Sequence, residues 1–243
     1  MGRRLPRPQA PRQGRGVTAA EQKRTAGEAA AGLVRDGMIV GLGSGTSAEA
    51  FVRALAPRAG ALKAVATSEG TAALAESLGF TLVDLNDAGP IDLTVDGADE
   101  IGPGLALIKG GGGALLREKL VWEASRRRVV IAEAAKLPGR FGRFPLPIEV
   151  VAFGHATTAA RIDAALAGLG YRAHARLRRR DGLAVRTDGG NVIYDAPCEV
   201  IADPDALAGA LKALTGVVEH GLFLNLAERA LIGTVDGVVI LHP

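Results

Sequence analysis

Residues that could move a proton stand beside a glycine run in the middle of the chain. The segment Asp96 to Glu100 carries three carboxylates, and Lys109 precedes the glycines 110–113 and the charged triplet Arg117 to Lys119. A carboxylate can accept a proton from carbon, while a lysine or backbone N–H groups can stabilise the resulting oxyanion. This combination indicates acid–base chemistry on an anionic substrate, without a cofactor.

Each part also has an ordinary structural interpretation. Four glycines often form a flexible turn, and the charged triplet suits a solvated helix face. Asp96 and Asp99 could close a turn after a strand at 92–95. Their coincidence in one short segment nevertheless favours chemistry, because turns and solvated faces have no reason to place acid, base and anion site together.

Two glycine-containing loops are expected to bind an anion. The apolar run 105–108 predicts a strand that ends at Lys109, and a helix is expected to open near Ala114. Glycines leave backbone N–H groups unscreened, and a helix N-terminus adds partial positive charge. The loop 41–47 has the same setting and three hydroxyls. It is not a dinucleotide fingerprint or a P-loop, because Thr46 replaces the last glycine and no Gly-Lys-Ser/Thr occurs.

The remaining pattern predicts an α/β protein with a parallel sheet covered on both faces, followed by a smaller α+β unit after the prolines at 138, 145 and 147. In such sheets the site lies at the carboxyl ends of the strands. The helices are predicted at 19–35, 47–55, 69–78 (with Ser68 as N-cap), 156–169 and from 203–204 onwards. The strands are predicted at 38–41, 61–66, 80–84, 92–95, 105–108, 128–132, 148–152, 171–177, 183–186, 192–194, 199–201, 217–223, 230–233 and 238–241.

Composition limits the classes of partner. The chain has 243 residues, is 48% hydrophobic and carries a net charge of +3, with five arginines and no acid in its first 16 residues. Residues 1–18 are predicted to be a disordered basic tail, and the lack of interleaved aromatics there argues against nucleic-acid binding. No apolar run reaches membrane-spanning length, so a cytoplasmic protein is expected. Four scattered histidines show no metal-ligand spacing, so no metal is expected.

Several segments resemble the A-type ribose-5-phosphate isomerase family, in the order and separation that the family shows. The resemblance runs from about Lys23 to the C-terminus. It is carried by residues 40–47, 96–101, 107–119, 144–150, 189–193 and 216–223.

This resemblance implies reversible conversion of D-ribose 5-phosphate to D-ribulose 5-phosphate through a cis-enediol, with neither metal nor nucleotide. Glu118 would carry the proton between C1 and C2, and Lys109 with the glycine run would stabilise the oxygen charge. Asp96 and Asp99 would bind sugar hydroxyls and assist ring opening. Lys23 and Lys136 would aid phosphate binding. The other residues expected at the substrate are Ser44, Gly45, Thr46, Ser47, Gly97, Ala98, Gly110, Gly111 and Gly112.

The resemblance further implies a Rossmann-like catalytic domain (19–143 with 221–243), a ferredoxin-like small domain (144–220), and a homodimer or homotetramer. Two alternatives stay open. A sugar-phosphate-binding regulatory domain would need a helix-turn-helix, for which residues 1–17 are too short and proline-rich. A nucleotide-dependent oxidoreductase is disfavoured by the broken glycine pattern.

Overall fold

The computed structural model describes residues 17–243. The predicted disorder of the arginine-rich segment therefore lies outside the described residues, apart from Val17 and Thr18. Thr18 is the N-cap of helix α1 (Ala19–Ala31), in a reciprocal capping box with Glu21. The start of α1 is thus fixed by its own side chains.

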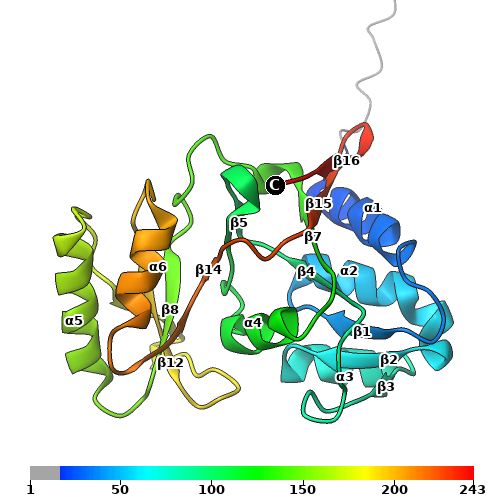
Figure 1. The fold of residues 1–243 in the computed structure, drawn as a ribbon, viewed down its shortest axis with the longest axis horizontal. Coiled ribbons are helices and arrows are strands. Elements are labelled where there is room, and N and C mark those ends of the chain that lie inside the picture. The colour runs from blue at the N-terminus through cyan, green and yellow to red at the C-terminus, as the bar shows by residue number, and fades with distance from the viewer. Residues whose placement is uncertain (1–16) are drawn as a thin grey trace, which may run out of the picture.

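A seven-stranded sheet forms the larger part of the molecule (Figure 1). Its order is β16-β15-β7-β4-β1-β2-β3, and every neighbouring pair is parallel except β15 with β16. This confirms the predicted mainly parallel sheet. The strands are β1 (Ile39–Leu42), β2 (Lys63–Ala66), β3 (Thr81–Leu82), β4 (Leu93–Gly97), β7 (Arg128–Glu133), β15 (Arg229–Thr234) and β16 (Gly237–Leu241).

Both faces of this sheet are covered, and the alternation of side chains along β7 shows how. Val129 and Ile131 join the core formed with α1, α2 (Thr46–Leu55) and α3 (Glu69–Ser77). Val130 and Ala132 point to the other face, against Trp122 of α4 (Leu115–Glu123). The near-continuous apolar sequence of the strand follows from burial on both sides.

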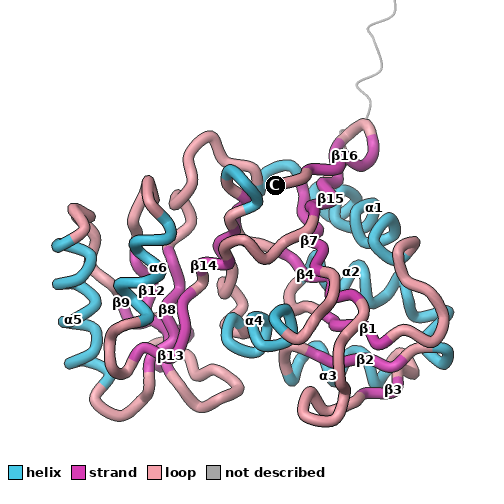
Figure 2. Tube along the Cα trace, viewed as in Figure 1, coloured by secondary structure: helices cyan, strands magenta, loops and turns pink. Residues whose placement is uncertain are grey.

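A four-stranded antiparallel sheet with two helices forms the smaller part, at the left of Figures 1 and 2. Its order is β13-β8-β12-β9, and alternate residues of β8 pack against α5 and α6. Asp203 caps α6, as the Asp-Pro pair predicted. The elements are β8 (Leu146–Val150), β9 (Arg176–Leu177), β12 (Val192–Ala196), β13 (Val217–His220), α5 (His155–Gly168) and α6 (Pro204–Lys212).

Between the two lies a small antiparallel sheet of order β14-β6-β5. It consists of β5 (Glu100–Ile101), β6 (Leu107–Ile108) and β14 (Leu222–Phe223), while α4 contacts β13 of the smaller part. Short 3-10 helices complete the described chain at Ala56–Ala61, Pro103–Leu105 and Ala134–Lys136. The residues around Lys109 therefore lie where the two larger sheets approach each other.

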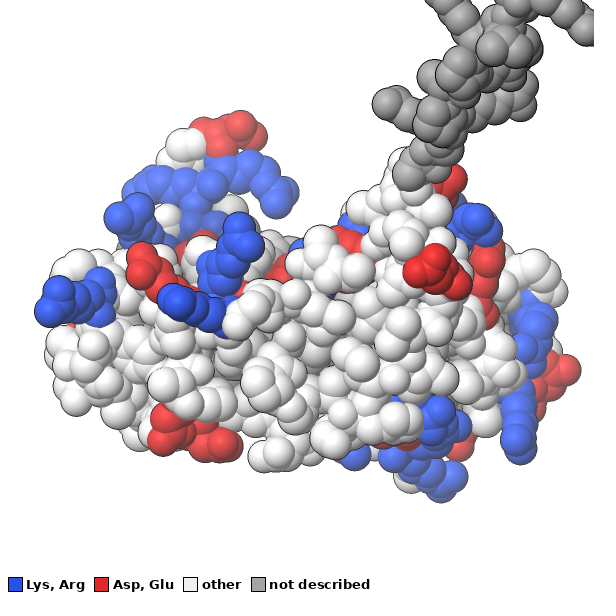
Figure 3. All heavy atoms as spheres, turned by 90° about the horizontal axis from the view of Figure 1, so that it is seen from above, with Lys and Arg blue, Asp and Glu red and all other residues white. Residues whose placement is uncertain are grey.

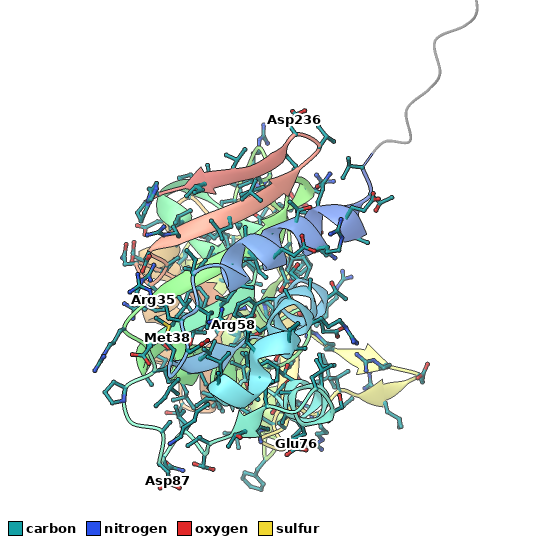
Figure 4. All side chains as sticks on the ribbon, turned by 90° about the vertical axis from the view of Figure 1, so that its right-hand side faces the viewer. Arg35, Met38, Arg58, Glu76, Asp87 and Asp236 are labelled. Carbon is teal, nitrogen blue, oxygen red and sulfur yellow. The ribbon has the colours of Figure 1, made fainter. Side chains whose placement is uncertain are left out.

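Two hairpins project from this body (Figure 4). One joins β15 to β16, with Asp236 at its tip. The other joins β10 (Arg179–Arg180) to β11 (Leu183–Ala184), where Asp181 and Gly182 take positive φ values of 52° and 80° as a tight two-residue turn requires. No helix in residues 17–243 is both long and apolar enough to cross a bilayer.

Four strand predictions were wrong at least in part. Of the predicted strand 171–177, only β9 (Arg176–Leu177) is a strand. The run 105–108 forms only β6, outside the parallel sheet. The predicted strand 217–223 is divided at Gly221, where a Cβ atom would overlap the carbonyl group of Lys109, and its two halves join different sheets. Residues 199–201 form no strand, because Glu199 has a left-handed φ of 61°.

Candidate functional site

A cavity of about 100 Å³ opens at the carboxyl ends of β1 and β4. The chain runs from β1 outward to β2 and β3, then returns to place β4 on the other side of β1. That reversal of strand order is where open α/β sheets hold their ligands. The lining residues are Lys23, Ser44, Gly45, Thr46, Ser47, Gly97, Ala98, Asp99, Lys109, Gly110, Gly111, Gly112, Glu118 and Lys136.

This lining brings together every site residue predicted from the sequence except Asp96, which lies fully buried in β4 beside it. The loops after β1 and β4, which follow two of the predicted strands, both face this cavity. The lining comes from α1, from the loops after β1, β4 and β6, from α4, and from the turn after β7. Such long-range convergence is what the parallel topology supplies.

Lys109 stands at the centre of a buried charge cluster. Its Nζ atom donates to the carbonyl oxygen of Gly97 at 2.7 Å and lies 3.0 Å from Asp96 Oδ2 and 3.3 Å from Glu118 Oε1. The rings of Trp122 and Phe223 flank the ammonium group, with centroids 5.9 and 5.4 Å away. Two aromatic faces and two carboxylates therefore hold one cation in place.

Burial and mutual repulsion make one of these carboxyl groups a stronger base than usual. Burial, reinforced by the charge of Asp96 and opposed by Lys109, raises the pKa of Glu118 to about 8. Burial also raises the pKa of Asp96 against the influence of Lys109. Burial acts to lower the pKa of Lys109, but the two carboxylates outweigh it and the pKa is raised. Lys109 is thus a fixed cation next to a proton-accepting carboxyl group.

Asp96 is held by backbone N–H groups on the strand floor. Its Oδ1 atom accepts from the N–H of Ser44 at 3.1 Å and from that of Gly97 at 2.7 Å. The carboxylate fits because position 43 has no side chain: a Cβ atom on Gly43 would overlap it. The close approach of an aspartate therefore explains the glycine at position 43.

We expect Gly43→Ala to be destabilised by about 1–3 kcal/mol, because overpacking forces Asp96 or the backbone to move. Turnover should fall as well, because Lys109 is paired with Asp96 and would move with it. Urea unfolding and steady-state kinetics measure both effects. Gly60→Ala is the matched control, since a Cβ atom there meets nothing within 4 Å. Equal stability of the two variants would show that Gly43 is not needed for the approach.

The glycine run forms a tight turn over the site. Gly110 and Gly113 have φ values of 104° and 93°, which side-chain-bearing residues rarely adopt. The N–H of Gly111 donates to Asp99 Oδ2 at 2.7 Å, and a Cβ atom on Gly111 would lie 2.6 Å from that carboxylate. The run thus brings one backbone N–H, that of Gly111, onto a carboxylate of the cavity lining.

The start of α2 is suited to an anion. Its N-cap is Gly45, with φ 87° and no side-chain cap, so the first-turn N–H groups of the helix stay open to the cavity. Lys23 Nζ donates to Thr46 Oγ1 at 2.9 Å, and Lys136 lines the same cavity. A phosphate here would meet a helix N-terminus, a hydroxyl and two lysines.

Ser44 is placed differently from its neighbours. Its hydroxyl lies within hydrogen-bond distance of three other hydroxyls, those of Thr67 at 2.8 Å, Ser68 at 2.7 Å and Thr71 at 3.1 Å. Thr71 in turn donates to the carbonyl oxygen of Gly43 at 3.0 Å. The loop 67–71, expected to supply a helix cap, does so through Ser68 and also braces the loop after β1.

Sequence reasoning missed Arg178, which reaches the glycine run from the smaller part. Its Nη1 atom donates to the carbonyl oxygens of Gly110 and Gly111. Arg178 stands among the arginines of 176–180, where nothing in the spacing distinguishes it. Trp122 and Phe223 were missed as well, because their proximity to Lys109 depends on the tertiary fold.

The fold and the site define an α/β enzyme that handles a small anionic substrate. The family model described as "Ribose 5-phosphate isomerase A (phosphoriboisomerase A)" matches residues 63–237. Ribose-5-phosphate isomerase A of Caulobacter sp. (strain K31) is 62% identical over 227 residues, covering 93% of this chain and all of the relative. The chain belongs to the ribose 5-phosphate isomerase A family.

Solved structures agree. Ribose 5-phosphate isomerase from Plasmodium falciparum superposes with a TM-score of 0.86 at 33% identity, covering 92% of this chain and 99% of the other. A second D-ribose-5-phosphate isomerase, in complex with phospho-erythronic acid, gives 0.86 at 31% identity, with 93% and 100% covered. The two-sheet architecture is therefore that of the family.

Proposed function

We propose that this chain interconverts D-ribose 5-phosphate and D-ribulose 5-phosphate, with Glu118 carrying a proton between C2 and C1. The main support for this proposal is that Glu118 is buried with one carboxylate oxygen free of hydrogen bonds in the described chain. It is buried in the cavity wall, with Oε1 beside Lys109 and Oε2 without a hydrogen-bond partner among residues 17–243. Burying an unsatisfied oxygen is unfavourable, so such an atom is a candidate for work on a substrate.

The steps follow from the positions of the charges. With the sugar open, Glu118 removes the proton from C2, and the electron pair moves to the C1 carbonyl oxygen to give a cis-enediolate. Lys109 and the N–H groups of the glycine run stabilise that oxygen. Glu118 then returns its proton to C1 as the C2 oxygen becomes the carbonyl, and the hydroxyl proton passes between O2 and O1.

The remaining site residues are proposed to bind the substrate. Asp99 would bind sugar hydroxyls and assist ring opening, with Gly97 and Ala98 lining the wall beside it. The same role was predicted for Asp96, but Asp96 is fully buried beside the cavity, so we propose that it acts by holding Lys109. The open N-terminus of α2, with Gly45, Thr46 and Ser47, would take the phosphate. Because the Ser44 hydroxyl is engaged by other hydroxyls, we propose that Ser44 acts by shaping this loop.

The test is an assay of the purified protein with ribose 5-phosphate in the presence of a chelator, following ribulose 5-phosphate. Conversion at enzymatic rates supports the proposal. Calorimetric binding of ribose 5-phosphate without conversion would instead support the regulatory-domain alternative.

Lys23→Ala should raise KM for ribose 5-phosphate about tenfold, because a charge-assisted contact to phosphate is worth about 1.5–3 kcal/mol and Lys23 is partly exposed. The effect should vanish with unphosphorylated ribose at high concentration. Arg24→Ala is the control, since Arg24 pairs with Glu28 on the outer face of α1. An equal effect on both sugars would mean that Lys23 does not bind phosphate.

Further features of the protein remain proposals. The strands of the four-stranded sheet all fall within residues 146–220, and those of the seven-stranded sheet within 39–133 and 229–241. This supports a catalytic domain of 19–143 with 221–243 and a small domain of 144–220. The edge strand β16 exposes Val239 and Ile240, which supports a homodimer or homotetramer. A cytoplasmic location stays a prediction.

A further inference from the structure

One side chain of the smaller part, Arg178, binds the glycine run over the cavity from the outside. Arg178 follows β9 directly, and its Nη1 atom donates to Gly110 O at 2.8 Å and Gly111 O at 3.1 Å. Its other nitrogens bind Asp195 of β12, with Nε donating to Oδ2 at 2.8 Å and Nη2 to Oδ1. This two-point pair fixes the plane of the guanidinium group.

The bonds from Arg178 to these two carbonyl oxygens also set the direction of the N–H groups in the same peptide planes. In a planar trans peptide the C=O and the following N–H point in opposite directions. With the carbonyls of Gly110 and Gly111 drawn towards Arg178, the N–H groups of Gly111 and Gly112 face the other way. The first donates to Asp99 Oδ2 at 2.7 Å, and the second has no acceptor within residues 17–243.

An external hold is needed because the run itself is conformationally free. Glycine peptides reach left-handed and right-handed regions with similar ease, so four in sequence can rotate their N–H groups away from the site. The turn has one internal bond, from the N–H of Gly113 to the carbonyl oxygen of Gly110 at 3.0 Å. Arg178 adds two bonds from outside the run, to the carbonyl oxygens of Gly110 and Gly111.

We propose that Arg178, oriented by Asp195, is a positioning residue of the glycine run. It presents the Gly112 N–H group to the substrate oxygen that becomes negative during the reaction, while the Gly111 N–H stays on Asp99. The inference rests on the isomerase function proposed above. Arg178 does not touch the substrate in this scheme; it acts through the peptide planes of the glycine run. If Arg178 only joined the two sheets, its removal would lower stability but would not lower kcat in the folded protein.

Arg178→Ala tests this, with Arg179→Ala as the matched control. Arg179 is the next residue, is exposed on the β10–β11 hairpin and donates only to the carbonyl oxygen of Gly182 within the described chain. Figure 3 shows that Lys and Arg gather over this end of the molecule, and each variant removes one positive charge from it. Any difference between them reflects the grip on the glycine run.

We expect Arg178→Ala to lower kcat about 10- to 100-fold with a smaller change in KM, because removing one oxyanion donor costs roughly 10²–10³ in kcat and here the donor is disoriented rather than deleted. Binding of phospho-erythronic acid should weaken by a similar factor, while binding of inorganic phosphate stays unchanged. Arg179→Ala should match the wild type in all three. Asp195→Asn keeps the shape of the side chain but weakens its two-point pair with Arg178, so its kcat should lie between those of the wild type and Arg178→Ala.

Unchanged kcat and unchanged phospho-erythronic acid binding in folded Arg178→Ala would overturn the proposal. Parallel loss of inorganic phosphate binding would also overturn it, since that pattern reports a general collapse of the site. If Arg178→Ala does not fold, Arg178→Lys serves: it keeps the charge and can reach one carbonyl, so kcat should fall at unchanged melting temperature. Turnover by the wild type is measured first. Were it absent, the isomerase proposal would fail, while phospho-erythronic acid binding would still report on the grip.

Discussion

Replacing Glu118 with glutamine should lower kcat about 10²- to 10⁴-fold, the range that a positioned general base contributes. KM should change little, because the amide has the same shape and still fits beside Lys109. The reason for the large effect is that Glu118 lines the cavity with Oε2 free of hydrogen bonds in the described chain. Asp96 Oδ2 is also without a hydrogen-bond partner there, but Asp96 is fully buried beside the cavity and its Oδ1 accepts two backbone N–H groups. Asp99 accepts the N–H of Gly111.

Glu123→Gln is the control for this variant, since it makes the same change on the exposed side of α4. It should keep wild-type kinetics. Full activity of Glu118→Gln, or equal losses in the two variants, would remove Glu118 from the proposed role.

The pH profile gives a second measurement of the same group. A base works as the carboxylate, so kcat/KM should rise with pH as Glu118 loses its proton, through an apparent pKa near the raised value of about 8. The stability of the protein should change with pH in the opposite direction to kcat/KM. Because the folded-state pKa lies above the unfolded value, the folded state binds the proton more tightly, and stability is lost as pH rises through the folded pKa. Glu118→Gln should therefore melt higher than the wild type at pH 9 and show a smaller difference at pH 5.

Lys109→Met should nearly abolish turnover and also destabilise the protein. Lys109 neutralises Asp96 and Glu118 in a site where its own side chain is 3% exposed. Removing one partner of a buried ion pair typically costs about 3–5 kcal/mol, because the remaining charge stays buried without compensation. The loss should be largest at alkaline pH, where both carboxyl groups are ionised, and smaller in acid, where they take up protons. Urea unfolding at several pH values measures it.

A double variant separates charge from chemistry. Asp96→Asn combined with Lys109→Met removes one of the two carboxylates that Lys109 neutralises. The double variant should recover part of the stability lost in Lys109→Met, while turnover stays absent. Lys63→Met, at an exposed position of β2, controls for the loss of a lysine. Wild-type stability of Lys109→Met alone would mean that the cluster is not coupled as the distances indicate.

Much of the fold follows from short-range physics that is legible in the sequence. The apolar strands of the parallel sheet, the caps at Ser68 and Asp203, and the hairpin at Asp181-Gly182 depend on neighbouring residues only, and all are present. The cavity lining was predicted mainly through the resemblance to one family. The residues alone indicated an anion site, because glycines and hydroxyls follow a strand and precede a helix.

What could not be predicted depends on partners distant in sequence. Leu107 and Ile108 look like a parallel-sheet strand, but their pairing with 100–101 and 222–223 is decided by the tertiary fold. Pro147 was taken to mark a boundary, yet it lies inside β8, where its carbonyl oxygen accepts from the N–H of Gly221. Arg178 was indistinguishable from its neighbours, since only the folded chain brings it to Gly110.

The chain contains one tryptophan, and the fold buries it completely at this site. Trp122 meets Phe223 edge to face, with centroids 5.6 Å apart, and its ring lies beside the ammonium group of Lys109. Selective excitation of indole therefore gives a luminescent signal from one known spot. Protonation of the charge cluster, ligand binding and unfolding each change the surroundings of this indole. The intrinsic fluorescence of Trp122 can therefore follow all three without a label.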